Sequence, residues 1–134
     1  MSKALFTLEE ANQLLPKLEK ELIIIQNLRN QFQLQFQELT ILKEISHNEA
    51  IKTSEEVFLI ESKLEFLEMQ AELHLHNIHA TGAKLKEINL GLIDFPAMIN
   101  GEKVLLCWKQ GEKEIAHYHK ETEGFASRRL IDEN

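Results

Sequence analysis

The sequence predicts an α+β fold: a long antiparallel helical hairpin, kinked near Pro16, followed by a small C-terminal antiparallel β-meander. Up to Gly82, apolar residues recur at intervals of three and four positions, which is the period of amphipathic helices. Beyond it, glycines appear at positions 91, 101, 111 and 124, and the apolar residues fall into short runs separated by turn residues. This change of pattern separates a helical part from a β-rich part.

Length and charge limit what the chain can be. Its 134 residues fit a single domain, 1–134, with the hairpin in 1–82 and the β-rich region in 83–134. The 22 acidic and 15 basic residues give a net charge of -7, which repels phosphate backbones and anionic lipids. We therefore expect no nucleic-acid partner and no membrane partner.

Cysteine content and the first residues bear on the compartment. The single cysteine, Cys107, cannot form an internal disulfide, and no apolar signal-peptide core follows Met1. The longest dense apolar stretch, 22–25, is far shorter than the roughly 20 residues that span a bilayer. These features predict a cytoplasmic protein.

The first helix is expected to begin at a capping box and to bend once. Thr7 and Glu10 can each bond the other's backbone N–H through a side-chain oxygen, which is typical of a helix start. Pro16 lacks a backbone donor about two turns later, so we expect a kink there or a break into two helices. An apolar stripe, interrupted at Arg29, continues the helix toward Ile45. The stripe consists of Leu15, Leu18, Leu22, Ile25, Phe32, Phe36 and Leu39.

A second helix of similar length is expected after a connection within residues 46–54. The segment 53–56 supplies N-cap hydroxyl groups followed by glutamates, and Gly82 is a natural C-terminal stop. Its packing stripe follows a heptad pattern and consists of Val57, Ile60, Leu64, Leu67, Ala71, His74 and Ile78. Two such helices with a short connection predict an antiparallel hairpin.

Both helices also carry apolar residues outside these stripes. They are Ile23, Ile24, Leu28, Leu34, Phe58, Leu59, Phe66 and Leu75. A lone hairpin cannot cover them, so we expect a homodimer or higher homo-oligomer in which coiled-coil hairpins form a four-helix bundle. The first functional hypothesis is therefore a non-enzymatic binding or scaffold protein that self-associates through its hairpin and offers the β region to an unknown protein partner. A regulator that acts by helix exchange is less favoured, because Arg29 and Pro16 interrupt the seam.

The C-terminal region is expected to form the β-meander over 97–119. The Asn-Gly pair at 100–101 favours a tight turn, and 103–108 is rich in strand-forming residues. A tight turn around Gly111 then leads into a second strand that includes Ile115.

Three stretches carry rare residue types at fixed spacing. Residues 6–16 contain FTLEEAN and then LLP, and residues 91–97 read GLIDFPA. Residues 105–128 contain LLCW, GE, YH, GF and an arginine in that order. Together they resemble a bacterial family catalogued as domain of unknown function 2203. The resemblance covers nearly the whole chain and implies a bacterial protein without an established activity. Tyr118 stands where the family pattern has a tryptophan before the histidine.

A set of polar side chains in the C-terminal region is the first candidate site. Its members with acid-base groups are His119, Glu112, Asp94 and Arg128. The second functional hypothesis is a small metal-dependent or acid-base enzyme that uses them. Cys107 with His119 as its base is the one nucleophile pair. A tight turn at Gly111 would pair even with odd positions and turn Cys107 away from His119, although a bulge or an odd-length turn would reverse this.

Structural roles for the same residues are the favoured interpretation. Cys107 suits a small buried apolar group, and the Asp94 carboxylate suits a turn in which it binds backbone N–H groups. Arg128 can pair with Glu112 or Glu123 and so fix the C-terminal segment. The sequence has no phosphate-binding glycine loop, dinucleotide fingerprint or nucleophile elbow, so whether the protein is an enzyme stays open.

Two further sets of residues have metal-ligand types. No cofactor is expected, and a divalent metal is the alternative. His117 and His119 alternate along one strand face, while Glu72, His76 and His79 project from one face of the second helix. Both spacings are also common without a metal, and the helical set would need further ligands from the facing helix.

Overall fold

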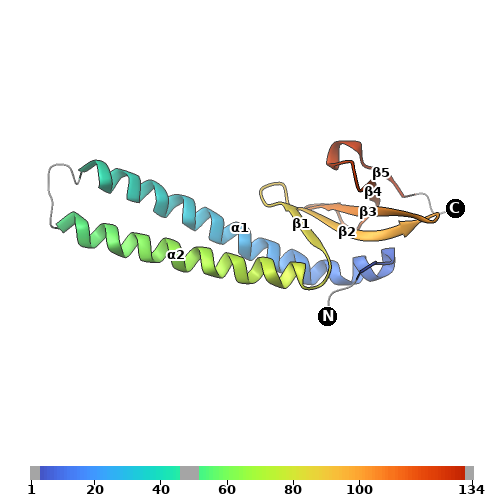
Figure 1. Cartoon of the computed structure of the whole chain (residues 1–134), viewed down its shortest axis with the longest axis horizontal. Coiled ribbons are helices and arrows are strands. Elements are labelled where there is room, and N and C mark those ends of the chain that lie inside the picture. The colour runs from blue at the N-terminus through green and yellow to red at the C-terminus, as the bar shows by residue number, and fades with distance from the viewer. Residues whose placement is uncertain (1–3, 46–51, 132–134) are drawn as a thin grey trace. The chain divides into compact units, whose positions relative to one another are not determined.

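A computed structural model describes residues 4–45 and 52–131 (Figure 1). Its elements in chain order are α1 (Leu8–Ile45), α2 (Lys52–His79), β1 (Lys84–Glu87), β2 (Leu92–Ile99), β3 (Glu102–Lys109), β4 (His117–Lys120), the 3-10 helix η1 (Phe125–Ser127) and β5 (Arg129–Leu130). The predicted α+β class, a helical hairpin before an antiparallel β region, is confirmed. Most of the predicted hairpin connection, 46–51, lies outside the described residues.

Helix α1 begins at the predicted capping box. The Thr7 side-chain oxygen accepts the N–H of Glu10 at 3.1 Å, and the Glu10 carboxylate accepts the N–H of Thr7 at 2.8 Å. Pro16 lies inside α1, so the helix does not break there, and the bend expected at this position stays a prediction. Over the part of the chain that the structure describes, neither long helix has a segment apolar enough to cross a membrane.

Helix α2 ends just before the predicted glycine stop. The N–H of Gly82 donates to the carbonyl of His79 at 3.0 Å, and Gly82 has a φ of +100°, a left-handed conformation that favours glycine. The chain then enters β1.

The chain divides into two compact units. One comprises Ile24–His74, and we call it the hairpin unit. The other comprises Met1–Ile23 with Leu75–Asn134, and we call it the sheet unit. Each helix contributes to both units, and the single-domain prediction stays a prediction.

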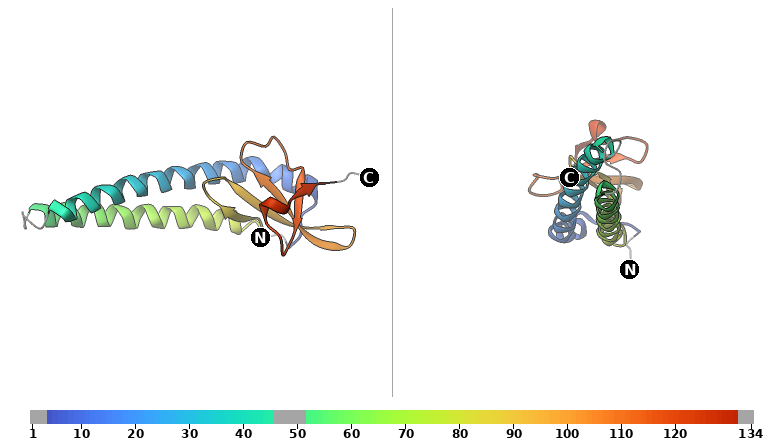
Figure 2. Two further views of the ribbon diagram at one scale, coloured as in Figure 1. Left: turned by 90° about the horizontal axis from the view of Figure 1, so that it is seen from above. Right: turned by 90° about the vertical axis from the view of Figure 1, so that its left-hand side faces the viewer.

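In the hairpin unit α1 and α2 run antiparallel and side by side (Figures 1 and 2). Their shared core contains Leu39, Ile60 and Leu64, with Phe32, Leu42 and Val57 packed against it. Each helix thus buries one stripe against the other. Many large apolar side chains of the unit remain exposed, among them Ile24, Leu34, Phe36, Ile41, Phe58, Leu59, Phe66, Met69 and Leu73.

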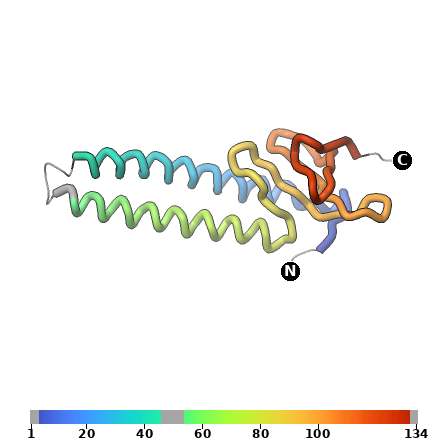
Figure 3. Tube along the Cα trace, turned by 45° about the horizontal axis from the view of Figure 1, so that its top comes forward, coloured from blue at the N-terminus to red at the C-terminus, as the bar shows by residue number. Residues whose placement is uncertain are grey.

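The sheet unit contains a five-stranded sheet in which every strand pairs antiparallel with the next along the chain. Figure 3 traces this part of the chain in yellow to red. The expected Asn-Gly turn joins β2 to β3: Asn100 and Gly101 have φ values of 51° and 79°, as a two-residue hairpin turn of type I′ requires. The sheet is larger than the predicted meander over 97–119, because β1 and most of β2 come before it.

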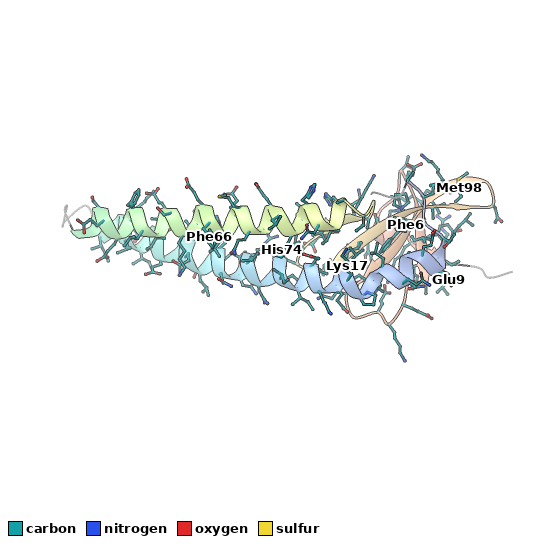
Figure 4. The ribbon with its side chains drawn as sticks, turned by 90° about the horizontal axis from the view of Figure 1, so that it is seen from below. Phe6, Glu9, Lys17, Phe66, His74 and Met98 are labelled. Atoms are coloured by element: carbon teal, nitrogen blue, oxygen red, sulfur yellow. The ribbon has the colours of Figure 1, made fainter. Side chains whose placement is uncertain are left out.

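One face of this sheet packs on the beginning of α1. The Phe95 ring meets the Phe6 ring edge to face, with centroids 5.4 Å apart (Phe6 is labelled in Figure 4). The N–H of Ile115 donates to the side-chain oxygen of Asn12 at 2.8 Å. Trp108, on the same face as Phe95, is buried. The opposite face therefore holds the residues of other parity, including Asp94 and Cys107.

The predicted facing of the strands on either side of Gly111 is wrong. Cys107 pairs directly with His117, so Cys107 and His119, two residues further along β4, lie on the same face. The reason is the length of the connection. The chain does turn at Gly111, where the N–H of Glu112 donates to the carbonyl of Lys109 at 3.0 Å, but β4 begins only after the whole connection 110–116, an odd number of residues. The parity of the pairing changes accordingly.

Candidate metal centre

Asp94, Cys107 and His119 come from three neighbouring strands and meet on one face of the sheet. Asp94 lies opposite Cys107, and His119 lies opposite Leu105, two residues along the same face. The three residues are 3%, 1% and 3% exposed. Their oxygen, sulfur and nitrogen ligand atoms all lie within 4.8 Å of one another, and among the described residues no other group of three or more metal-ligand types does so. We call them the Asp-Cys-His cluster.

The hydrogen bonds of His119 fix which ring nitrogen faces the cluster. Nδ1 lies 2.8 Å from the carbonyl oxygen of Lys120, and because a carbonyl only accepts, Nδ1 carries a proton and donates it. Nε2 lies 3.1 Å from Oδ2 of Asp94. In a neutral imidazole this nitrogen has a lone pair, so a proton or a cation must lie between it and the carboxylate.

Burial raises the pKa of the other two residues of the cluster. Desolvation raises the pKa of the Asp94 carboxyl, although His119, Cys107 and the charge of Lys86 act in the opposite direction. Desolvation and the neighbouring Asp94 charge raise the pKa of the Cys107 thiol to about 11. A thiol that is protonated at neutral pH is a poor nucleophile, whereas a coordinated metal ion removes its proton.

The spacing of the donor atoms fits a small divalent ion. Zinc bonds sulfur at about 2.3 Å and nitrogen or oxygen at about 2.0–2.2 Å, so tetrahedral ligand atoms are roughly 3.3–3.7 Å apart. The distance from His119 Nε2 to Asp94 Oδ2 is 3.1 Å, and the widest separation in the cluster is below 4.8 Å. The observed spread thus includes the separations that a zinc ion needs.

A cavity of about 200 Å³ lies beside the cluster, and all three cluster residues line it. Its other walls come from strands β1, β2 and β3 and from the segment after β4. The residues are Lys86, Leu92, Leu105, Glu121, Glu123, Gly124 and Phe125. A ligand that entered this cavity would meet the cluster together with both charged and apolar side chains.

Arg128 and Glu112 form an ion pair that holds the C-terminal segment, which we call the Arg128–Glu112 clasp. The two guanidinium nitrogens donate to the two carboxylate oxygens at 3.0 and 2.8 Å, as predicted for this pair. Burial alone would raise the pKa of Glu112, but hydrogen bonds from Arg128 and from the N–H of Lys109 outweigh it and lower the pKa. The Arg128 guanidinium also stacks on Phe125, 4.4 Å from the ring centroid. The clasp thus supports one wall of the cavity.

The remaining predicted metal ligands do not belong to the cluster. His117 shares the face of the cluster, but its Nδ1 is buried, has no hydrogen-bond partner among the described residues and lies 3.7 Å from a carboxylate oxygen of Glu112. Asp94 lies within β2, not in the turn expected for it, because the apolar residues around it form a buried strand. Glu72, His76 and His79 form no such group of ligand atoms within the described ranges. The Nε2 of His79 accepts the N–H of Leu85 at 3.2 Å.

The sequence analysis placed Asp94 and His119 in one candidate site and paired Cys107 with His119, but it did not predict the three residues as one group of metal ligands. Lys86 was missed as a cavity wall, because no strand was predicted before residue 97. The signal for the grouping is the stretch 92–97, which is apolar apart from Asp94. Such a run indicates a buried strand, and a carboxylate inside it needs a partner in the core.

The sequence model of the family described as "Uncharacterized conserved protein (DUF2203)" matches residues 4–131, so the chain belongs to this family. No curated protein and no solved structure matches the chain. The stretches that carried the resemblance to the family also carry the cluster and the clasp.

Proposed function

We propose that this member of the DUF2203 family binds one divalent transition-metal ion, zinc above all, through Asp94, Cys107 and His119. The observation that carries the proposal is the convergence of three buried donor atoms, with the Nδ1–H of His119 already directed at a backbone carbonyl. Metal-bound histidines almost always donate their other ring N–H in this way, which fixes the tautomer and points the free lone pair at the ion.

The chemistry of the donor set favours zinc. Thiolate, imidazole and carboxylate are the three ligand types of zinc sites, whereas magnesium and calcium prefer oxygen alone. The proposed setting is the bacterial cytoplasm, where the reducing thiol pool keeps a lone cysteine such as Cys107 available to a metal.

Three protein ligands leave a fourth position for water or an exogenous ligand. Zinc sites with purely structural roles usually have four protein ligands, and those that act on a substrate usually have three. The cavity beside the cluster supports the second type. We therefore favour the hypothesis of a small metal-dependent enzyme, with Asp94 and His119 as ligands and the Arg128–Glu112 clasp as a support of the cavity wall.

Metal analysis of purified, tag-free protein tests this proposal. After equilibrium dialysis against zinc, the wild-type chain should hold about one ion. Asp94→Asn, Cys107→Ser and His119→Gln should each weaken zinc binding at least about tenfold. His76→Gln, a histidine variant on the exposed surface of α2, is the matched control and should bind as the wild type does.

Because the ligands are buried, circular dichroism must show that each variant folds. The wild-type protein loaded with cobalt gives a second measurement that needs no variant, since a thiolate-to-metal charge-transfer band reports Cys107 as a ligand. A wild-type chain that binds no zinc, or folded cluster variants that keep it, would contradict the proposal.

We also propose that the chain forms at least a homodimer through the hairpin unit, so that two hairpins make a four-helix assembly. The large apolar side chains that remain exposed on both helices support this. A scaffold that presents its sheet unit to a protein partner is the corresponding function. Native mass spectrometry with a dilution series tests the assembly, and a stable folded monomer at micromolar concentration would contradict it.

A further inference from the structure

We infer that two copies of the chain pair through one particular face of the hairpin unit, with α1 of one copy on α2 of the other. This inference rests on the proposed self-association. We call the surface the apolar face, and it consists of Ile24, Leu34 and Ile41 on α1 and Leu59, Phe66 and Leu73 on α2. All six residues are exposed, from 38% for Ile24 to 66% for Leu34 and Leu59.

The apolar face has the periodicity of a helix-packing seam. Leu59, Phe66 and Leu73 are spaced seven residues apart, and so are Leu34 and Ile41. A heptad spacing keeps side chains on one line along a helix and is typical of residues that pack against another helix. The expected occupant is therefore helical.

Helix geometry places both halves of the apolar face on one side of the hairpin. Each of the six residues comes directly before a buried or half-buried residue: Ile25, Gln35 and Leu42 on α1, and Ile60, Leu67 and His74 on α2. One step back along a helix rotates a side chain by about 100° in a fixed sense. The two right-handed helices are antiparallel and face a shared core from opposite sides. The same backward step therefore turns the side chains of both helices to the same side of the hairpin.

The area of the apolar face suits a second copy of the chain. Six side chains of this size, a little over half exposed, offer roughly 500 Å² of apolar surface. A standard interface buries about 800 Å² per partner, of which somewhat more than half is apolar. Because every copy carries the same face, a two-fold symmetric dimer covers both faces at once.

Charge selects the pairing of α1 with α2. Lys63 lies three or four positions from Leu59 and Phe66, so it is on the α2 half of the apolar face. Glu38 lies three or four positions from Leu34 and Ile41, so it is on the α1 half. Pairing like helices would bring like charges together, whereas α1 packed on α2 of the other copy brings Glu38 and Lys63 to the same interface.

Charged substitutions on the apolar face test the inference by sedimentation velocity over a dilution series. The double variant Phe66→Glu/Leu73→Glu should raise the dimer dissociation constant at least about 100-fold. Phe58→Glu is the matched control: Phe58 is 68% exposed but follows the half-buried Val57, which puts it on the other side of the hairpin. It should leave the dissociation constant within about twofold.

A mixing experiment tests the helix pairing. A Leu34→Lys/Ile41→Lys chain mixed with the Phe66→Glu/Leu73→Glu chain should form heterodimers, because the new lysines of one copy then meet the new glutamates of the other. A wild-type monomer would overturn the proposed self-association itself. A wild-type dimer that survives Phe66→Glu/Leu73→Glu, or that Phe58→Glu disrupts equally, would overturn only the choice of face. Mixed chains that stay monomeric would overturn the pairing of α1 with α2.

Discussion

Breaking the Arg128–Glu112 clasp should destabilise the sheet unit by an amount that depends on both partners. Their side chains are 16% and 24% exposed, so solvent screens the pair less than a surface pair, which contributes about 0.2–1 kcal/mol. With two charge-assisted hydrogen bonds, we expect a coupling energy of about 1–2 kcal/mol. Arg128→Ala also loses the stacking on Phe125, so its total cost should be about 2–3 kcal/mol.

A double-mutant cycle measures this coupling. It compares Arg128→Ala, Glu112→Gln and the double variant. Glutamine keeps a side-chain oxygen that accepts the N–H of Lys109, so Glu112→Gln removes the charge and leaves that hydrogen bond in place. Trp108 is the only tryptophan and is 1% exposed, so its fluorescence in urea reports on the sheet unit. The urea midpoint of Arg128→Ala should fall by about 1 M or more at unchanged slope. Single effects that add to within about 0.3–0.5 kcal/mol would refute the reasoning.

Three further predictions follow from individual residues. The lowered pKa of Glu112 means that the unfolded chain binds its proton more tightly, so the stabilisation is present above its ordinary value of 4.5 and is lost as the pH falls through the lower folded value. Glu112→Gln should therefore flatten the acid side of a plot of urea midpoint against pH, and an unchanged plot contradicts this. Cys107 is 1% exposed with a pKa raised to about 11, so iodoacetamide should modify it at least about 100-fold more slowly in the folded than in the unfolded protein, and equal rates would show that it is accessible. Gly91 and Gly101 have φ values of +71° and +79°, but a Cβ at Gly91 would lie 2.6 Å from the Cβ of Gln110, while one at Gly101 would meet no atom of the described residues within 4 Å. Gly101→Ala should therefore cost about 1–2 kcal/mol and Gly91→Ala about 1–3 kcal/mol more, as read from thermal unfolding, and equal losses would rule out the steric argument.

The helical part could be predicted from the sequence because its signals are local. The capping box at Thr7 and Glu10 involves residues three positions apart, and the structure forms both of its hydrogen bonds. The heptad that contains Ile60 and Leu64 likewise identifies the buried stripe of α2. The Asn-Gly turn at 100–101 is equally local.

The candidate site could not be assembled from the sequence because it depends on strand register. Asp94, Cys107 and His119 were each recognised as residues of a functional type. Whether His119 lies on the same face as the other two depends on whether the connection between β3 and β4 has an odd or an even number of residues. A one-residue change in register moves a side chain to the other face of a sheet. The prediction that the next strand follows the turn at Gly111 directly therefore separated Cys107 from His119, which the structure brings together.

The most direct measurement of the central claim is zinc-edge X-ray absorption on the zinc-loaded wild-type protein. If Asp94, Cys107 and His119 bind the ion, the spectrum should show one sulfur at about 2.3 Å and two or three nitrogen or oxygen atoms at about 2.0–2.2 Å, with outer-shell scattering from one imidazole. A shell of nitrogen and oxygen alone, without the sulfur, would contradict the assignment of the cluster as the metal site.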